Sequence, residues 1–174
     1  EAGGGYYEGA YKRLEKICDR CRGKKITVVI DECFLEFTRK RGFFETHSLQ
    51  EYPNVIIVKA FTKLYAIPGV RLGFLFCGDQ NRTEQILNQL PEWNISTIAE
   101  AAGLAALDET EYCNKTTSYI EKERAYLKAE LEKMEIKVYP GEADFLLLKT
   151  EHPLYEKLLR AKILIRDCGN YRGL

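Results

Sequence analysis

The sequence lacks the glycine loops that many nucleotide-binding proteins use to hold phosphate groups. Neither GxGxxG nor GxxxxGK[ST] occurs in the 174 residues, which argues against a dinucleotide-binding protein, an NTPase or a glycosyltransferase. Lys plus Arg equals Asp plus Glu, at 26 each, so no net charge attracts nucleic acid or an anionic membrane. Apolar runs are far shorter than the ~20 residues that span a bilayer, and no signal-peptide pattern opens the chain. We therefore expect a cytoplasmic protein that binds neither nucleic acid nor membrane.

Cysteine and histidine are present but not clustered. With 45% apolar residues, the chain can form a core without disulfides, so reduced thiols are expected. Cys18-x-x-Cys21 lies within a helical pattern and has no second CxxC, whereas structural zinc needs four ligands at set spacing; a metal site is thus only an alternative. His47 and His152 are isolated, and we expect both to be solvated surface residues. The cysteines are Cys18, Cys21, Cys33, Cys77, Cys113 and Cys168.

Two runs rich in β-branched residues predict strands buried on both faces, as in parallel sheets. The run Ile26–Ile30 ends at Asp31, and the run Val55–Lys59 ends shortly before Lys63. Open α/β sheets bind ligands at the carboxyl ends of their strands. Taken alone, an Asp after a strand is more often a cap or turn residue, and a loop Lys is usually solvated. Their order and spacing together favour a shared site.

The segment Ala60–Phe74 (AFTKLYAIPGVRLGF) combines a lysine, a hydroxyl and an arginine. A fixed, partly desolvated lysine such as Lys63 can form a Schiff base. The hydroxyl of Thr62 and the planar guanidinium of Arg71 suit a phosphate group. This segment strongly resembles the cofactor-lysine motif of fold-type-I pyridoxal-5'-phosphate (PLP) enzymes. The resemblance is to the class I/II aminotransferase family, in the branch containing histidinol-phosphate aminotransferase and threonine-phosphate decarboxylase.

The resemblance implies a role for each residue of the strand-end site. Lys63 would hold PLP and serve as general acid/base, while Asp31 would pair with the pyridinium nitrogen and make the ring an electron sink. Thr62 and Arg71 would hold the phosphate. Phe34, in the DECF segment, stands where aminotransferases often have a tyrosine that bonds the phenolic oxygen of the cofactor.

The resemblance also implies an α/β fold: part of the large PLP-binding domain, with a mostly parallel sheet flanked by helices, and a small C-terminal α/β domain. The family's phosphate loop, ring-stacking aromatic residue and carboxylate-binding arginine are not found, so we expect a fragment, inactive by itself, of a homodimeric enzyme.

The expected parts are a flexible end at 1–9, a partial large domain at 10–109, a bridging helix at 110–134 and the small domain at 135–174. The expected elements are helices at Tyr11–Arg22, Asn81–Leu90, Ile95–Leu107 and Pro153–Ala161 and strands at Leu72–Cys77 and Ile163–Arg166.

The function that this resemblance implies is a PLP-dependent reaction on an amino acid or phosphorylated amino acid. The stretch Ile163–Tyr171 is more similar to threonine-phosphate decarboxylases than to histidinol-phosphate aminotransferases, which remain the alternative. Arg166 is the expected ligand of a substrate phosphate; the other interpretation is a surface arginine paired with Asp167 or a neighbouring carboxylate. A different class also stays open, namely a catalytically incomplete chain that acts as a binding or regulatory module.

Overall fold

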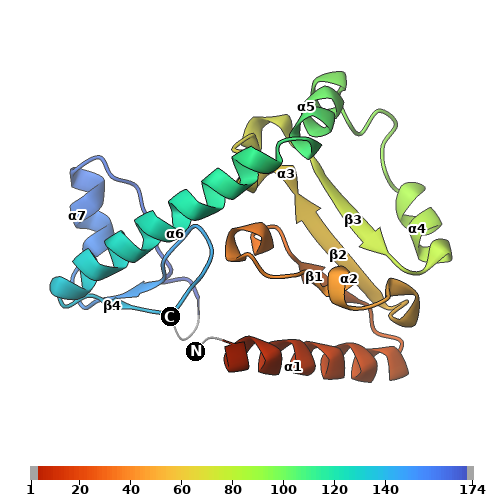
Figure 1. Ribbon diagram of the computed structural model, residues 1–174, viewed down its shortest axis with the longest axis horizontal. Coiled ribbons are helices and arrows are strands. Elements are labelled where there is room, and N and C mark those ends of the chain that lie inside the picture. Colours follow the sequence, from red (N-terminus) through yellow and green to blue (C-terminus); the bar gives the residue numbers. More distant parts are fainter. Residues whose placement is uncertain (1–3, 172–174) are drawn as a thin grey trace. The chain divides into compact units, whose positions relative to one another are not determined.

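The computed structural model describes residues 4–171, which belong to two compact units, Glu1–Thr117 and Ser118–Leu174 (Figure 1). The division falls inside the long helix α6. Helix α1 begins at Gly4, earlier than expected, so residues 4–9 form its first turns and residues 1–3 lie outside the described part. The first unit contains α1 (Gly4–Gly23), β1 (Val28–Asp31), η1 (Leu35–Thr38), α2 (Phe43–Thr46), η2 (Leu49–Glu51), β2 (Val55–Ala60), α3 (Phe61–Leu64), η3 (Pro68–Val70), β3 (Gly73–Cys77), α4 (Gln80–Leu87), α5 (Thr97–Leu107) and the start of α6 (Thr110–Lys133).

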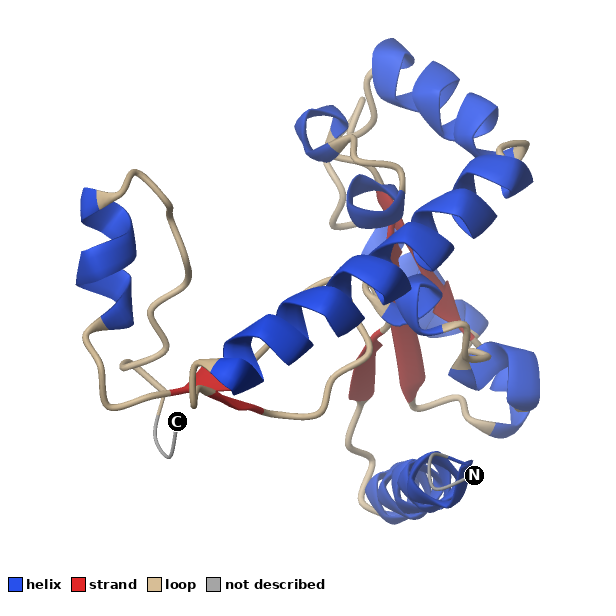
Figure 2. Ribbon diagram, turned by 60° about the vertical axis from the view of Figure 1, so that its left-hand side comes forward, coloured by secondary structure: helices blue, strands red, loops and turns tan. Residues whose placement is uncertain are grey.

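The sheet of the first unit has the order β1-β2-β3. Strands β1 and β2 are parallel, with Asp31 opposite Val58. Both strands therefore end at the same edge, as the sequence predicted. Strand β3 runs antiparallel to β2, with Gly73 opposite Ala60. The sheet is mixed because β3 begins at the edge where β2 ends and returns beside it. Figure 2 shows the three strands side by side.

The core of the first unit lies on one face of this sheet. Cys18 from α1 and Phe43 from α2 pack with Val55 and Ile57 of β2, and all four are fully buried. The prediction that both faces of these strands are buried is wrong for β1, since Val29 is 61% exposed. Side chains alternate across a strand, and these core helices cover only the face that carries Val55 and Ile57.

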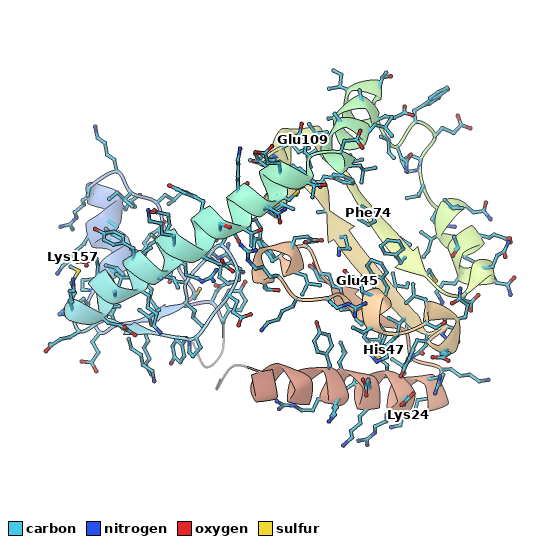
Figure 3. The ribbon with its side chains drawn as sticks, viewed as in Figure 1. Lys24, Glu45, His47, Phe74, Glu109 and Lys157 are labelled. Atoms are coloured by element: carbon cyan, nitrogen blue, oxygen red, sulfur yellow. The ribbon has the colours of Figure 1, made fainter. Side chains whose placement is uncertain are left out.

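A histidine connects α2 to α1. The Nε2 atom of His47 lies 2.9 Å from Glu15 Oε1, and its ring stacks on Phe43 with centroids 4.3 Å apart. Tyr52 meets the same ring edge-on. Figure 3 shows His47 between the sheet and α1. The expectation of a solvated histidine is therefore wrong here, because the imidazole fills space between aromatic rings.

The second unit combines the rest of α6 with β4 (Lys137–Val138), β5 (Leu148–Lys149) and α7 (Leu154–Arg160). Strands β4 and β5 form an antiparallel pair. The strand expected at Ile163–Arg166 is absent, because these residues have no partner strand among the described residues. Instead, the Ile163 N–H bonds to the carbonyl of Leu158 at the end of α7. None of the described helices is long and apolar enough to cross a membrane.

Candidate active site at the ends of two parallel strands

The carboxyl ends of β1 and β2 bring three of the predicted site residues together. Asp31 is the last residue of β1, and β2 leads directly into α3, which carries Lys63. Phe34 precedes η1, in the loop after β1, and its ring centroid lies 5.4 Å from Lys63 Nζ. An ammonium group at this distance from an aromatic face is attracted by the ring quadrupole. The lysine, the carboxylate and the ring therefore belong to one strand-end site. Lys63 is exposed, so the expectation of a partly desolvated lysine is wrong for this chain.

Contacts with Cys33 favour the ionised form of the Asp31 carboxylate. Its Oδ1 accepts the backbone N–H of Cys33 at 2.9 Å. The hydrogen bonds from the thiol and the backbone N–H of Cys33 are the main causes that lower the pKa of Asp31, and the positive charge of Lys63 adds to them. The electrostatic effect of Lys63 on Asp31 agrees with their positions at neighbouring strand ends.

The turn that carries Lys63 packs through Tyr65. The ring of Tyr65 stacks on Phe61 with centroids 5.5 Å apart and on Tyr112 of α6 at 6.2 Å. Burial raises the pKa of the Tyr65 phenol, and a hydrogen bond with Cys113 adds to the effect. This neutral, packed tyrosine fixes α3 against the first turns of α6 within the first unit.

The two predicted phosphate ligands, Thr62 and Arg71, lie on adjoining segments. Thr62 is a buried residue of α3, next to Lys63 in the chain. Arg71 follows η3 in a left-handed conformation, with φ of 58°, and its Nη1 donates to the Pro68 carbonyl at 3.1 Å. The Phe61 N–H bonds to the Leu72 carbonyl at 3.2 Å, so the backbone beside Arg71 meets the start of α3. Arg71 itself is exposed and accessible to an anion.

Arg166 belongs to the second unit, whereas the strand-end residues belong to the first. It is exposed, and its guanidinium carbon lies 5.9 Å from the centroid of the Tyr171 ring. Its expected alternative partner, Asp167, instead accepts the Gly169 N–H at 2.9 Å. Within the described residues, Arg166 forms no ion pair with Asp167.

Sequence reasoning missed three charged residues beside the site, Lys59, Glu32 and Glu36. Lys59 Nζ lies 2.8 Å from Glu36 Oε1 and 3.7 Å from Glu32 Oε2. Both Lys59 and Glu32 are buried. A signal was present in the sequence: Lys59 shares the inward face of β2 with Val55 and Ile57, and a lysine at a buried position needs carboxylate partners.

The aminotransferase class I and II family matches residues 10–173, and the chain therefore belongs to this family. Threonine-phosphate decarboxylase of Salmonella typhimurium is 35% identical over 166 residues, which cover 92% of this chain and 45% of that protein. The histidinol-phosphate aminotransferase of Clostridium acetobutylicum superposes with a TM-score of 0.86 at 32% identity, over 94% of this chain and 51% of that one.

A third relative shares the fold at lower identity. The histidinol-phosphate aminotransferase of Sinorhizobium meliloti, solved in complex with pyridoxal-5'-phosphate, has a TM-score of 0.77 at 21% identity, over 87% of this chain and 44% of that one. The fold-type-I α/β architecture implied by the sequence resemblance is thus confirmed. The chain spans about half the length of the relatives it matches.

Proposed function

We propose that the whole protein containing this chain is a PLP-dependent enzyme that acts on an amino acid or a phosphorylated amino acid. The grouping of Lys63, Asp31 and the Phe34 ring at the ends of two parallel strands is the observation that supports this most directly. These residues fit PLP: an amine for its aldehyde, a carboxylate for its pyridinium nitrogen and an exposed guanidinium, Arg71, for its phosphate.

Each residue has a distinct task in this proposal. When bound, PLP supplies the electron sink for carbanion chemistry. Lys63 would hold the cofactor through Nζ and would accept or donate a proton at that atom. Asp31, whose pKa is lowered, stays ionised and holds the proton on the ring nitrogen. Phe34 supplies an apolar face without a hydroxyl, and Thr62 and Arg71 serve the phosphate.

Borohydride trapping of the full-length protein tests the cofactor site. Borohydride reduces a lysine–PLP linkage to a stable adduct, which peptide mass spectrometry locates. We expect the adduct on Lys63, and we expect Lys63→Ala to lose both the adduct and the visible absorbance band. Lys115→Ala, at an exposed position on α6, is the matched control and retains both. An adduct that persists in Lys63→Ala contradicts the assignment.

Among the reactions of the family, we propose decarboxylation of a phosphorylated amino acid such as threonine phosphate. The relative from Salmonella typhimurium, named for this reaction, supports it, as does the resemblance of Ile163–Tyr171. Arg166 would bind the substrate phosphate, for which a guanidinium offers paired donors in one plane. We further propose a cytoplasmic homodimer, consistent with exposed apolar side chains such as Trp93 and Ile98.

Two parallel assays with the full-length enzyme separate the candidate reactions. The first contains threonine phosphate, and the second contains histidinol phosphate with 2-oxoglutarate. Carbon dioxide release in the first assay alone supports the decarboxylase. Glutamate formation in the second assay alone supports the aminotransferase that the solved relatives represent. Absence of turnover and of bound PLP supports the remaining candidate, a binding or regulatory module.

A further inference from the structure

Three charged side chains form a partly buried network next to the strand-end site. Lys59 lies in β2, four residues before Lys63, and is 7% exposed. Its Nζ contacts Glu36 at 2.8 Å and Glu32 at 3.7 Å, and it lies 5.2 Å from the centroid of the Phe44 ring. Because charges removed from water are costly unless they are paired, losing one partner leaves the others uncompensated.

The geometry of Glu32 is fixed from both sides. Its Oε1 accepts the backbone N–H of Phe43 at 2.7 Å, at the start of α2. Its Oε2 has no hydrogen-bond donor among the described residues and points toward Lys59. A Cβ atom on Gly42 would lie only 2.5 Å from Oε2, so the absence of a side chain at Gly42 leaves room for the carboxylate. Lys59 therefore meets a carboxylate whose other oxygen is already bound.

The network joins segments that the backbone ladder alone leaves apart. The last backbone hydrogen bond from the β1 chain to β2 is donated by the Glu32 N–H to the Val58 carbonyl, at 2.9 Å. Beyond it, the chain turns into η1, which carries Glu36 and is preceded by Phe34. The contact with Glu36 thus attaches η1 to the end of β2. The contact with Glu32, which directly follows Asp31 in the chain, attaches the end of β1 to the same lysine.

We propose that Lys59 is a positioning residue, which acts through its two glutamate partners to hold the loop after β1 against the turn that carries the reactive amine. Through Glu32 it fixes the adjacent carboxylate of Asp31. Through Glu36 it fixes η1 and, with it, the ring of Phe34. The inference rests on the proposed function, because positioning matters only if these groups bind one ligand. Lys59 itself is not a ligand of the cofactor.

The test compares PLP binding by five forms of the full-length protein. These are the wild type, Lys59→Met, Lys59→Arg, Glu36→Gln and the control Lys115→Met, which breaks an exposed ion pair with Glu111. Far-ultraviolet circular dichroism first shows which forms are folded. Titration then gives the PLP dissociation constant, and the visible circular dichroism of the bound cofactor reports how its ring is held. Glu36→Gln changes the more exposed edge of the network and stays informative if Lys59→Met does not fold.

We expect Lys59→Met to weaken PLP binding about tenfold, a size typical of coupled neighbouring groups. We expect its visible dichroism to change even at saturating PLP, and we expect Lys59→Arg to restore both readouts. Glu36→Gln changes them in the same way, and Lys115→Met changes neither. Wild-type affinity and dichroism in folded Lys59→Met and Glu36→Gln overturn the positioning role and leave the proposed function intact. A wild-type protein that binds no PLP overturns the proposed function itself.

Discussion

Replacement of Asp31 by Asn tests the electrostatics of the candidate site through the thiol of Cys33. Burial is the main cause that raises the pKa of this thiol, from 9.0 to about 11. The hydrogen bond to Asp31 and the negative charges of Asp31 and Glu36 raise it further, and the ammonium of Lys63 opposes them. The thiol of Cys33 also lies 4.0 Å from the Val58 carbonyl. Its reactivity therefore reports the charges around it.

The expected reactivity of Cys33 in the wild type follows from the fraction of its thiol that is ionised. At about pH 8, a thiol with a pKa near 9 is about 10% ionised, and one with a pKa near 11 is about 0.1% ionised. The more basic thiolate is also the better nucleophile, which recovers about eightfold of this difference of about 100-fold. We therefore expect Cys33 to react about tenfold more slowly than an unperturbed thiol, before any effect of limited access.

The assay is alkylation of the PLP-free protein as a function of pH, with Cys33 followed by peptide mass spectrometry. In the wild type, the rate should keep rising as the pH passes 9.0, the ordinary pKa of a thiol. Asp31→Asn should lower the midpoint and speed alkylation, because it removes a negative charge that disfavours the thiolate. Lys63→Met should do the opposite. A wild-type rate that levels off near the ordinary pKa, or equal rates in the two variants, refutes the arrangement of charges described above.

Three further predictions concern stability and the isolated chain. Ile57→Ala should lower the free energy of unfolding by about 2–5 kcal/mol in urea titrations, because it opens a cavity in the core, whereas Leu87→Ala at a 59% exposed position should change it little. Asn54 is buried and donates to the carbonyls of Cys18 and Ile26. Asn54→Asp should therefore lose stability relative to the wild type as the pH rises above about 4, because the new carboxyl then ionises at a buried position. The 174-residue chain alone should bind PLP at best weakly in fluorescence titrations, since each missing charge-assisted hydrogen bond costs about 1.5–3 kcal/mol; micromolar affinity would contradict this.

Strand positions were predictable from the sequence where a strand finds its partner inside the first unit. The β-branched run at Val55–Ala60 forms the central strand, paired on both sides. The direction of β3 was not predictable, because it depends on how the chain returns after α3. The apolar stretch Ile163–Arg166 has the same local pattern as a strand, yet no partner strand lies beside it in the described residues. Local pattern therefore indicates the tendency to form a strand, and the neighbouring segment decides whether it forms.

In the candidate site, too, residues with a local sequence motif were predictable, whereas a residue whose role depends on contacts distant in the sequence was not. Lys63 and Asp31 were identified because each carries a local signal at a strand end, and parallel pairing of β1 and β2 then brings the two edges together. Lys59 has no such motif. The sequence pattern places Lys59 at the end of a strand but predicts no function for it. The pattern does not show which carboxylates contact this lysine in the folded chain.

Strand pairing and the ion network of Lys59, Glu32 and Glu36 position the site residues with different precision. The parallel pairing sets which residues end at the shared edge, but η1 has already left the ladder there. Burial of Phe37 holds η1 in place, but catalytic groups require a precision of about 0.5 Å. The contact of Lys59 with Glu36 supplies a second attachment of η1. Variants of the network should therefore impair cofactor binding while the strands keep their pairing, whereas variants of the core should impair both together.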